Sequence, residues 1–225
     1  MKILIVADEE SSALWDYYTP GKLAGYELIL SCGDLKAKYL EFLVTMARCP
    51  LLYVHGNHDG SFEQQPPEGC DCIDGKLVIY KGLRILGLGG CRRYNGGSHQ
   101  YTERQMQWRI HKLKWAVKLA GGVDLVLAHG APRGVGDADD LTHRGFESFL
   151  RLIDAWNPRY FLHGHVHMNY GINIPRVEYY RNTPVINCCG RYELETDQAG
   201  AGKPLSRDRK ILCKLLGKTV VMMDG

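Results

Sequence analysis

The sequence of 225 residues lacks a long apolar run, because no segment approaches the ~20 apolar residues that cross a membrane. The apolar run at residues 3–7 is too short for a signal peptide and is typical of a buried strand. The net charge is only +3 with histidine counted as neutral, so the composition gives no clear sign of a nucleic-acid partner. These absences predict a globular cytoplasmic protein without a membrane span, and they leave the oligomeric state open.

Cys-x-x-Cys pairs are also absent, although the chain contains eight cysteines. Cys70 and Cys72 are separated by one residue, and Cys188 and Cys189 are adjacent. A chain of 225 residues with 45% apolar residues is long enough to bury a core without disulfides. We therefore interpret the cysteines as free thiols in a reducing compartment.

Short apolar runs and helix-spaced apolar residues follow one another along the chain, which predicts an α/β fold. Strands are predicted at residues 3–7, 26–30, 51–54, 125–128, 160–162 and 184–187, and a hairpin at 76–80 and 83–88. Helical faces are predicted at residues 40–47, 106–117 and 146–153. Thr102 and Gln105 form a capping-box signature before the second helix. Residues 60–75 hold two adjacent prolines and little apolar material, so we expect a surface loop there.

Residues of the types that bind metals follow five of the predicted strands. They are Asp8, Asp34, Asn57, His58, His129, His165 and His167. In an open α/β sheet, ligands bind in the crevice outside the carboxyl ends of the strands. The set offers nitrogen and oxygen but no thiolate, which favours a catalytic site for manganese, iron or zinc over a structural zinc site. It is too large for one ion, and Asp34, in the turn after Gly33, is the natural carboxylate to bridge two.

The order and spacing of these residues resemble the signature blocks of the calcineurin-like metallophosphoesterases. The matching segments are Gly33-Asp34, Gly56-Asn57-His58-Asp59, His129 and Gly164-His165-Val166-His167. The resemblance spans about residues 1–190, which we take as one domain, with 191–225 as a C-terminal extension of unknown role. It implies an α/β fold of two stacked mixed β-sheets flanked by helices, with a dinuclear metal centre at the sheet edge.

The resemblance also implies a role for each residue. Asp8, Asp34 and His167 would hold the first ion, and Asp34, Asn57, His129 and His165 would hold the second. His58 would protonate the leaving oxygen, and Asp59 would orient it. The reaction implied is hydrolysis of a phosphate ester by hydroxide formed between two divalent ions. Manganese is the ion we expect first, with iron, zinc or magnesium as alternatives.

The chain departs from the family pattern at Glu10, which stands where the first block normally has histidine. A glutamate there can ligate through oxygen and favour manganese or magnesium, and we expect Glu10 to be a ligand. The alternative is that Glu10 points to solvent and the first site is weak or empty. In that case the protein is a scaffold that keeps the fold and works through protein contacts.

The substrate is less clearly written in the sequence than the reaction. Arg93, in a glycine-rich segment, is our candidate for a phosphate-binding cation, and His143 and Arg144 are candidates for the pocket rim. The chain has no obvious cap domain, so we expect an open cleft, which suits a phosphodiester or an extended substrate. The sequence leaves open whether the ester cleaved is a diester or a monoester. Residues 211–216 have the pattern of a short amphipathic helix in a basic tail.

Overall fold

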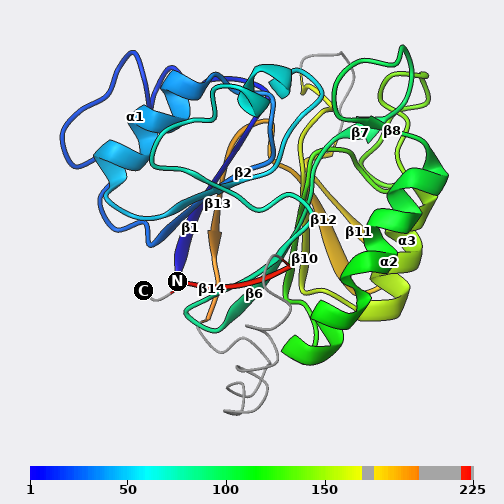
Figure 1. The fold of residues 1–225 in the computed structure, drawn as a ribbon. Helices are drawn as coiled ribbons and strands as arrows, with labels where there is room; N and C mark the ends of the chain where they lie inside the picture. The colour runs from blue at the N-terminus through cyan, green and yellow to red at the C-terminus, as the bar shows by residue number, and fades with distance from the viewer. Residues whose placement is uncertain (169–174, 198–218, 224–225) are drawn as a thin grey trace.

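Two mixed β-sheets form the centre of the computed structural model, which describes residues 1–168, 175–197 and 219–223 (Figure 1). The first sheet has five strands in the order β13-β1-β2-β3-β4, with bounds Gly190–Glu195, Lys2–Ala7, Leu28–Ser31, Leu51–Tyr53 and Asp71–Cys72. The second has seven in the order β11-β12-β10-β9-β6-β5-β14, with bounds Val177–Tyr180, Thr183–Asn187, Tyr160–His163, Leu125–Ala128, Leu83–Leu88, Leu77–Tyr80 and Val220–Met223. A small third sheet pairs β7 (Cys91–Arg92) with β8 (Gln100–Tyr101).

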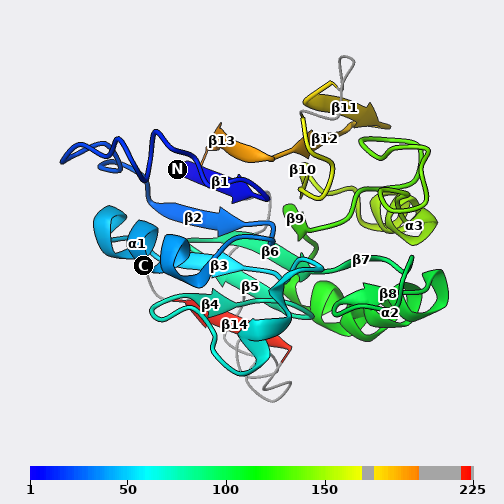
Figure 2. The same cartoon turned by 90° about the horizontal axis from the view of Figure 1, so that it is seen from above.

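Helices cover the outer face of each large sheet, with α1 (Ala37–Ala47) on one side and α2 (Glu103–Ala120) and α3 (Glu147–Trp156) on the other (Figure 2). Each layer follows from alternation along the strands, since successive side chains point to opposite faces. In β1, Ile3 and Ile5 pack between the sheets, whereas Leu4 and Val6 pack towards α1. The predicted α/β sandwich of two stacked mixed sheets is confirmed.

The parallel strands of both sheets bring their carboxyl ends to one edge of the sandwich. In the first sheet β1 is parallel to β2, and β2 is parallel to β3. In the second sheet β6, β9, β10 and β12 run parallel to one another in that order. Because parallel strands end on the same side, the polar residues that follow them gather there.

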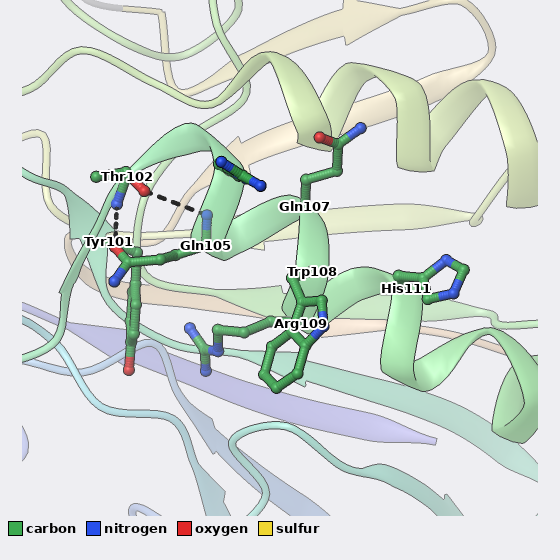
Figure 3. Close-up of a pocket in the computed structure, with 8 residues that line it drawn as sticks. Tyr101, Thr102, Gln105, Gln107, Trp108, Arg109 and His111 are labelled. Atoms are coloured by element: carbon green, nitrogen blue, oxygen red, sulfur yellow. Dashed lines mark hydrogen bonds between the residues drawn. The ribbon is translucent and has the colours of Figure 1, made fainter.

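Helix α2 begins as the sequence predicts, with a capping box. The Thr102 side chain accepts a hydrogen bond from the Gln105 N–H, and the Gln105 side chain accepts one from the Thr102 N–H. A hollow of about 850 Å³ lies along the first half of this helix (Figure 3). It is lined by Tyr101, Thr102, Arg104, Gln105, Gln107, Trp108, Arg109 and His111, none of which follows one of the five strands above.

The structure differs from the sequence interpretation mainly in strands that the sequence analysis did not predict. The segment expected to be a loop, residues 60–75, includes most of a 3₁₀ helix, Asp59–Glu63, and the strand β4. Strands β11, β13 and β14 have no counterpart among the predicted strands. β13 pairs with β1 and β14 pairs with β5, so the segment after residue 190 adds a strand to each large sheet. The amphipathic helix predicted at 211–216 lies outside the described residues.

Two further findings concern the predicted compartment. In the described part of the chain, no helix is both long and apolar enough to cross a membrane. The seven cysteines of that part are free thiols. A cytoplasmic location stays a prediction.

Candidate metal centre

The first two loops of the site place carboxylates in a strained backbone conformation. Asp8 directly follows β1 and Asp34 lies three residues after β2, with φ angles of +60° and +57°. His165, in the loop after β10, has φ of +67°. Residues other than glycine rarely adopt this left-handed region, and such strain is typically kept at functional sites. Three residues predicted as ligands therefore share an unusual conformation.

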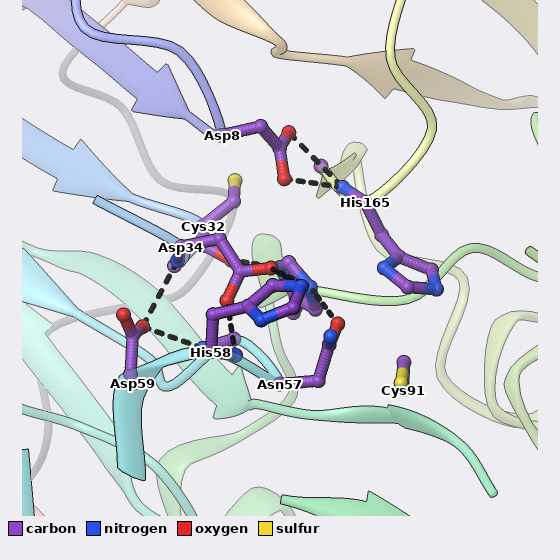
Figure 4. Close-up of polar contacts among 12 residues, drawn as sticks. Asp8, Cys32, Asp34, Asn57, His58, Asp59, Cys91 and His165 are labelled. Atoms are coloured by element: carbon purple, nitrogen blue, oxygen red, sulfur yellow. Dashed lines mark hydrogen bonds and ion pairs between the residues drawn. The ribbon is translucent and has the colours of Figure 1, made fainter. Parts of the chain in front are cut away.

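Asp34, His129 and His165 converge on one point. Each offers a ligand atom, and these atoms all lie within 4.8 Å of one another. Asp34 Oδ2 lies 3.3 Å from His129 Nε2, and the rings of His129 and His165 have centroids 4.9 Å apart. Figure 4 shows the side chains of Asp34 and His165 in this part of the structure. The carboxylate can approach this closely because residue 56 is glycine. A Cβ there would lie 2.0 Å from Asp34 Oδ1.

His129 is held with one particular nitrogen facing the site. Its Nδ1 lies 2.8 Å from the Cys32 carbonyl oxygen, which can only accept a hydrogen bond, so Nδ1 carries the proton. Nε2 then faces Asn57 Oδ1 at 3.0 Å. The Asn57 amide donates through Nδ2 to the Tyr94 hydroxyl at 3.3 Å, which leaves its oxygen towards His129. Such outer partners orient ligands in metal sites.

The charges of this cluster favour a cation among its atoms. Burial opposes a charge on His129, but the neighbouring Asp34 carboxylate outweighs it and raises the pKa of His129 to about 9. Burial would also raise the pKa of Asp34, but His129 lowers it to about 2. Nε2 thus lies between two oxygen acceptors, where a proton or a metal ion is stabilised. The residues present therefore fit a divalent cation.

His165 is prepared for the same task by burial. Burial lowers the pKa of His165 to about 3, so its imidazole is neutral, which is the form that binds metals. Its Nε2 donates to the Thr142 carbonyl at 2.9 Å, which leaves Nδ1 as the unprotonated nitrogen. His143 lies beside it, with ring centroids 5.1 Å apart, and also contacts the Asp140 carboxylate.

His58 and Asp59 lie on the neighbouring loop with different surroundings. The His58 backbone N–H donates to Asp34 Oδ1 at 2.7 Å, while its side chain is 76% exposed with Nε2 4.0 Å from Asp34 Oδ2. Asp59 Oδ2 accepts from the backbone N–H groups of Asp34 at 2.9 Å and Gly56 at 2.7 Å. Asp59 therefore joins the two loops, and any effect on His58 acts through the backbone.

A second group of ligand-type atoms lies beside Asp8. Glu9, His167 and Cys189 each offer an atom, and these also lie within 4.8 Å of one another. Both oxygens of Asp8 accept from the His165 N–H, at 2.9 and 3.0 Å. Burial raises the pKa of Asp8 to about 6, while His129 and then His167 act to lower it, so Asp8 lies within electrostatic reach of both groups.

The sequence interpretation missed Glu9, Cys189 and Tyr94. Glu9 adjoins a predicted ligand, and Cys189 follows the strand β12 just as the other candidates follow theirs, so the strand-end pattern contained both. Tyr94 lies in a loop and carries no such signal. Glu10, which we expected to be a ligand, belongs to neither group. Its Oε1 instead lies 3.3 Å from Nζ of the exposed Lys36.

The remaining candidates lie around the site. Arg93 is exposed and donates its backbone N–H to the Tyr101 carbonyl at 2.9 Å. Arg144 Nε is buried without a hydrogen-bond partner among the described residues. His163 is fully buried, and burial lowers its pKa to about 4, so it belongs to the core. The substrate roles of Arg93, His143 and Arg144, like the ligand and catalytic roles above, stay predictions.

Two hollows open beside the centre. One of about 790 Å³ is lined in part by Asp34, His58 and Lys36. The other, of about 520 Å³, is lined in part by Glu9 and Cys189. Asp34 of one group and Glu9 and Cys189 of the other are therefore reachable from solvent.

Known proteins are similar to this chain in sequence or in fold. A lariat debranching enzyme of Caenorhabditis briggsae is 22% identical over 219 residues, which cover 67% of this chain and 42% of that enzyme. The chain thus spans less than half the length of this relative. One solved structure has 14% identity and a TM-score of 0.60, covering 86% of this chain and 94% of the other. TT1561 of Thermus thermophilus has 17% identity and a TM-score of 0.57, covering 84% and 88%. Because the family model for the calcineurin-like phosphoesterase superfamily domain matches residues 1–201, the chain belongs to this superfamily.

Proposed function

We propose that the protein is a metal-dependent hydrolase of phosphoric esters, acting as a phosphodiesterase or phosphatase. The observation that carries this proposal is the convergence of Asp34, His129 and His165, with His129 Nε2 directed at two oxygen acceptors. Side chains held in this way bind a cation without rearrangement, which is the arrangement a catalytic metal site needs. The superfamily supplies the reaction class.

The residues of this centre would hold divalent ions, which would supply a hydroxide at neutral pH and offset the charge of the phosphate under attack. Asp34 is our candidate for a residue that would contact both ions, because it belongs to the group with His129 and His165 and its charge also acts on Asp8. The second ion would also be held by Asn57, His129 and His165. Manganese is the ion we expect there, with iron, zinc or magnesium as alternatives.

His58 acts as the proton donor for the leaving oxygen. Its side chain is exposed at the hollow of about 790 Å³, within 4.0 Å of Asp34 Oδ2, so a bound ester can reach it. An imidazole is a suitable general acid near neutral pH. Asp59 fixes the loop that carries His58 through its two backbone contacts.

The substrate contacts come from cations around the site. Lys36 lines the same hollow as His58, and Arg93 and Arg144 lie on neighbouring loops. These side chains are our candidates for binding the phosphate group or the rest of the ester. The similarity to a lariat debranching enzyme adds a lariat to the substrates to be tested.

The first test combines metal content with turnover on one sample purified without chelator. We expect about two metals per chain, and manganese-stimulated hydrolysis of an aryl phosphodiester or an aryl phosphomonoester. An Asp34→Asn variant should lose metal and activity together. One metal or none, with no turnover of either ester after reconstitution, would refute the hydrolase and favour the scaffold.

A further inference from the structure

The group formed by Glu9, His167 and Cys189 differs in chemistry from the one around Asp34. It contains a thiol, an imidazole and a carboxylate with ligand atoms within 4.8 Å of one another. Glu9 Oε1 lies 3.2 Å from His167 Nδ1. The three residues come from loops after β1, β10 and β12, which are far apart in sequence. Their meeting therefore depends on the fold rather than on local chain geometry.

A buried side-chain amide holds the backbone of Cys189 at this place. Asn187, 1% exposed, accepts a hydrogen bond from the Cys189 N–H at 3.0 Å through Oδ1. Its Nδ2 donates to the Val166 carbonyl at 2.7 Å, in the loop that carries His167. One side chain thus ties the cysteine loop to the histidine loop, which is how outer partners fix metal ligands.

The charges around Cys189 favour a bound cation and disfavour a thiolate without one. Burial raises the pKa of the Cys189 thiol, the carboxylates of Asp8 and Glu9 raise it further, and the Arg176 guanidinium acts in the opposite direction. A divalent ion between these groups would neutralise the carboxylates and stabilise the thiolate. The hollow of about 520 Å³ beside Glu9 and Cys189 gives an entry path.

We propose that Cys189 is a thiolate ligand of the first metal ion, together with Glu9 and His167, in the centre whose catalytic role rests on the proposed function. Asp8, whose charge acts on His167 and on Cys189, is the candidate for a fourth donor. Thiolate and imidazole favour zinc or ferrous iron over manganese or magnesium. Because it has a thiolate, the first position selects a softer ion than the second position, which has no sulfur donor, and Glu9, rather than Glu10, supplies its carboxylate.

The chain offers matched controls for Cys189 and for Glu9. Cys188 is fully buried, and its Sγ donates to the Ile186 carbonyl within the core between the sheets. It precedes Cys189 directly and shares its chemistry but not its location. Glu10 likewise adjoins Glu9 and contacts Lys36 instead of His167.

The test uses the full-length protein stripped of metal and titrated with Co²⁺ alone. We expect a near-ultraviolet thiolate-to-cobalt charge-transfer band with the wild type and with Cys188→Ser. Cys189→Ser should lose that band and weaken the binding of one cobalt by more than about tenfold. Glu9→Gln should weaken the binding of the same cobalt ion, whereas Glu10→Gln should bind cobalt as the wild type does.

A measurement on the wild type alone keeps the proposal testable if a variant does not fold. X-ray absorption of the zinc-loaded protein should show a Zn–S distance of about 2.3 Å. Absence of that distance, or a band that survives Cys189→Ser, would overturn the thiolate ligand. Two bound metals with ester turnover but no sulfur ligand would refute this proposal alone, whereas a sulfur ligand without turnover would refute the hydrolase alone.

Discussion

At the scale of single residues, His58 makes the sharpest chemical prediction because it is exposed and touches no core. Replacing His58 with Ala should slow hydrolysis of an ester with a poor alkyl leaving group by about 10²–10⁴-fold, since that oxygen needs a proton. The loss should be much smaller for a nitrophenyl ester, whose leaving group departs as an anion. The measurement is the ratio of kcat/KM for the two esters in both proteins.

His111→Ala is a suitable control for this experiment, because His111 is exposed on α2, outside the metal centre. It should leave both rates unchanged. Equal losses for the two esters in His58→Ala would argue against a role in protonation. The far-ultraviolet circular dichroism of both variants should match the wild type, since a side chain that is 76% exposed contributes little to stability.

Single residues also show where prediction from sequence succeeds and fails. Asp34, His129 and His165 were predicted because a short motif on each strand end carries its own signal, and the structure brings them together. The sequence does not show which of the neighbouring residues Glu9 and Glu10 lies beside His167. Their side chains leave the chain one residue apart, and only the turn after Asp8, with its φ of +60°, decides which one meets His167.

At the scale of secondary-structure elements, a buried ion pair joins the strands of the second sheet at the end opposite the metal centre. Arg84 on β6 donates through Nε and Nη2 to the Asp124 carboxylate at 2.8 and 2.6 Å, and both side chains are nearly inaccessible. Arg84 Nη1 also donates to the Gly121 carbonyl at the end of α2. The pair thus links β6, α2 and the start of β9.

Removal of one partner should leave an uncompensated buried charge. We expect Arg84→Met to lower the free energy of unfolding by about 3–5 kcal/mol. Arg151→Met is the matched control, because its pair with Glu147 is exposed on α3, and it should change stability by less than about 1 kcal/mol. Urea unfolding measures both. Equal effects of the two substitutions would contradict a special role for the buried pair.

Helices and strands were predictable where residues close together in the sequence, such as turn and cap residues, determine them. The hairpin of β5 and β6 and the capped helix α2 were found because their turn and cap residues are adjacent in sequence. Strand β14 was missed because its pairing partner, β5, lies about 140 residues earlier, as the register Val220 to Leu77 indicates. Such a pairing is decided by tertiary contacts, which no local pattern records.

At the scale of the whole molecule, a second charged network ties the two sheets and α2 together. Asp74 follows β4 of the first sheet and accepts from the Gly89 N–H, after β6 of the second, at 2.7 Å. Arg109 of α2 donates to the Asp74 carboxylate and to the Gly89 carbonyl. His55, after β3, completes the network with Nδ1 3.5 Å from Asp74 Oδ2.

Both titrating groups of this network make stability depend on pH. Burial would raise the pKa of Asp74, but His55 and Arg109 hold it below its ordinary value. Burial opposes a charge on His55, but the hydrogen bond with Asp74 outweighs it and raises the pKa of His55 to about 10. The contribution of Asp74 is therefore fully present above about pH 4, the pKa of an unfolded aspartate, and is lost as the pH falls further. The contribution of His55 is fully present below about pH 6.5 and is lost as the pH rises towards its folded pKa.

Asp74→Asn should therefore destabilise the protein most between about pH 4 and pH 6.5, where both contributions are complete. We expect a loss on the order of 3 kcal/mol there, because Arg109 and His55 lose their counter-ion in a buried setting. Urea unfolding of the wild type and the variant at several pH values gives the difference directly. The difference should shrink in more acidic solution, where the wild-type carboxylate is protonated, and in part above about pH 6.5, as the unfolded His55 loses its proton and only the pair with Arg109 keeps its full value. A difference that stays constant from acidic to alkaline pH would show that Asp74 contributes by packing rather than by its charge, and the two sheets would then be held together by their apolar core alone.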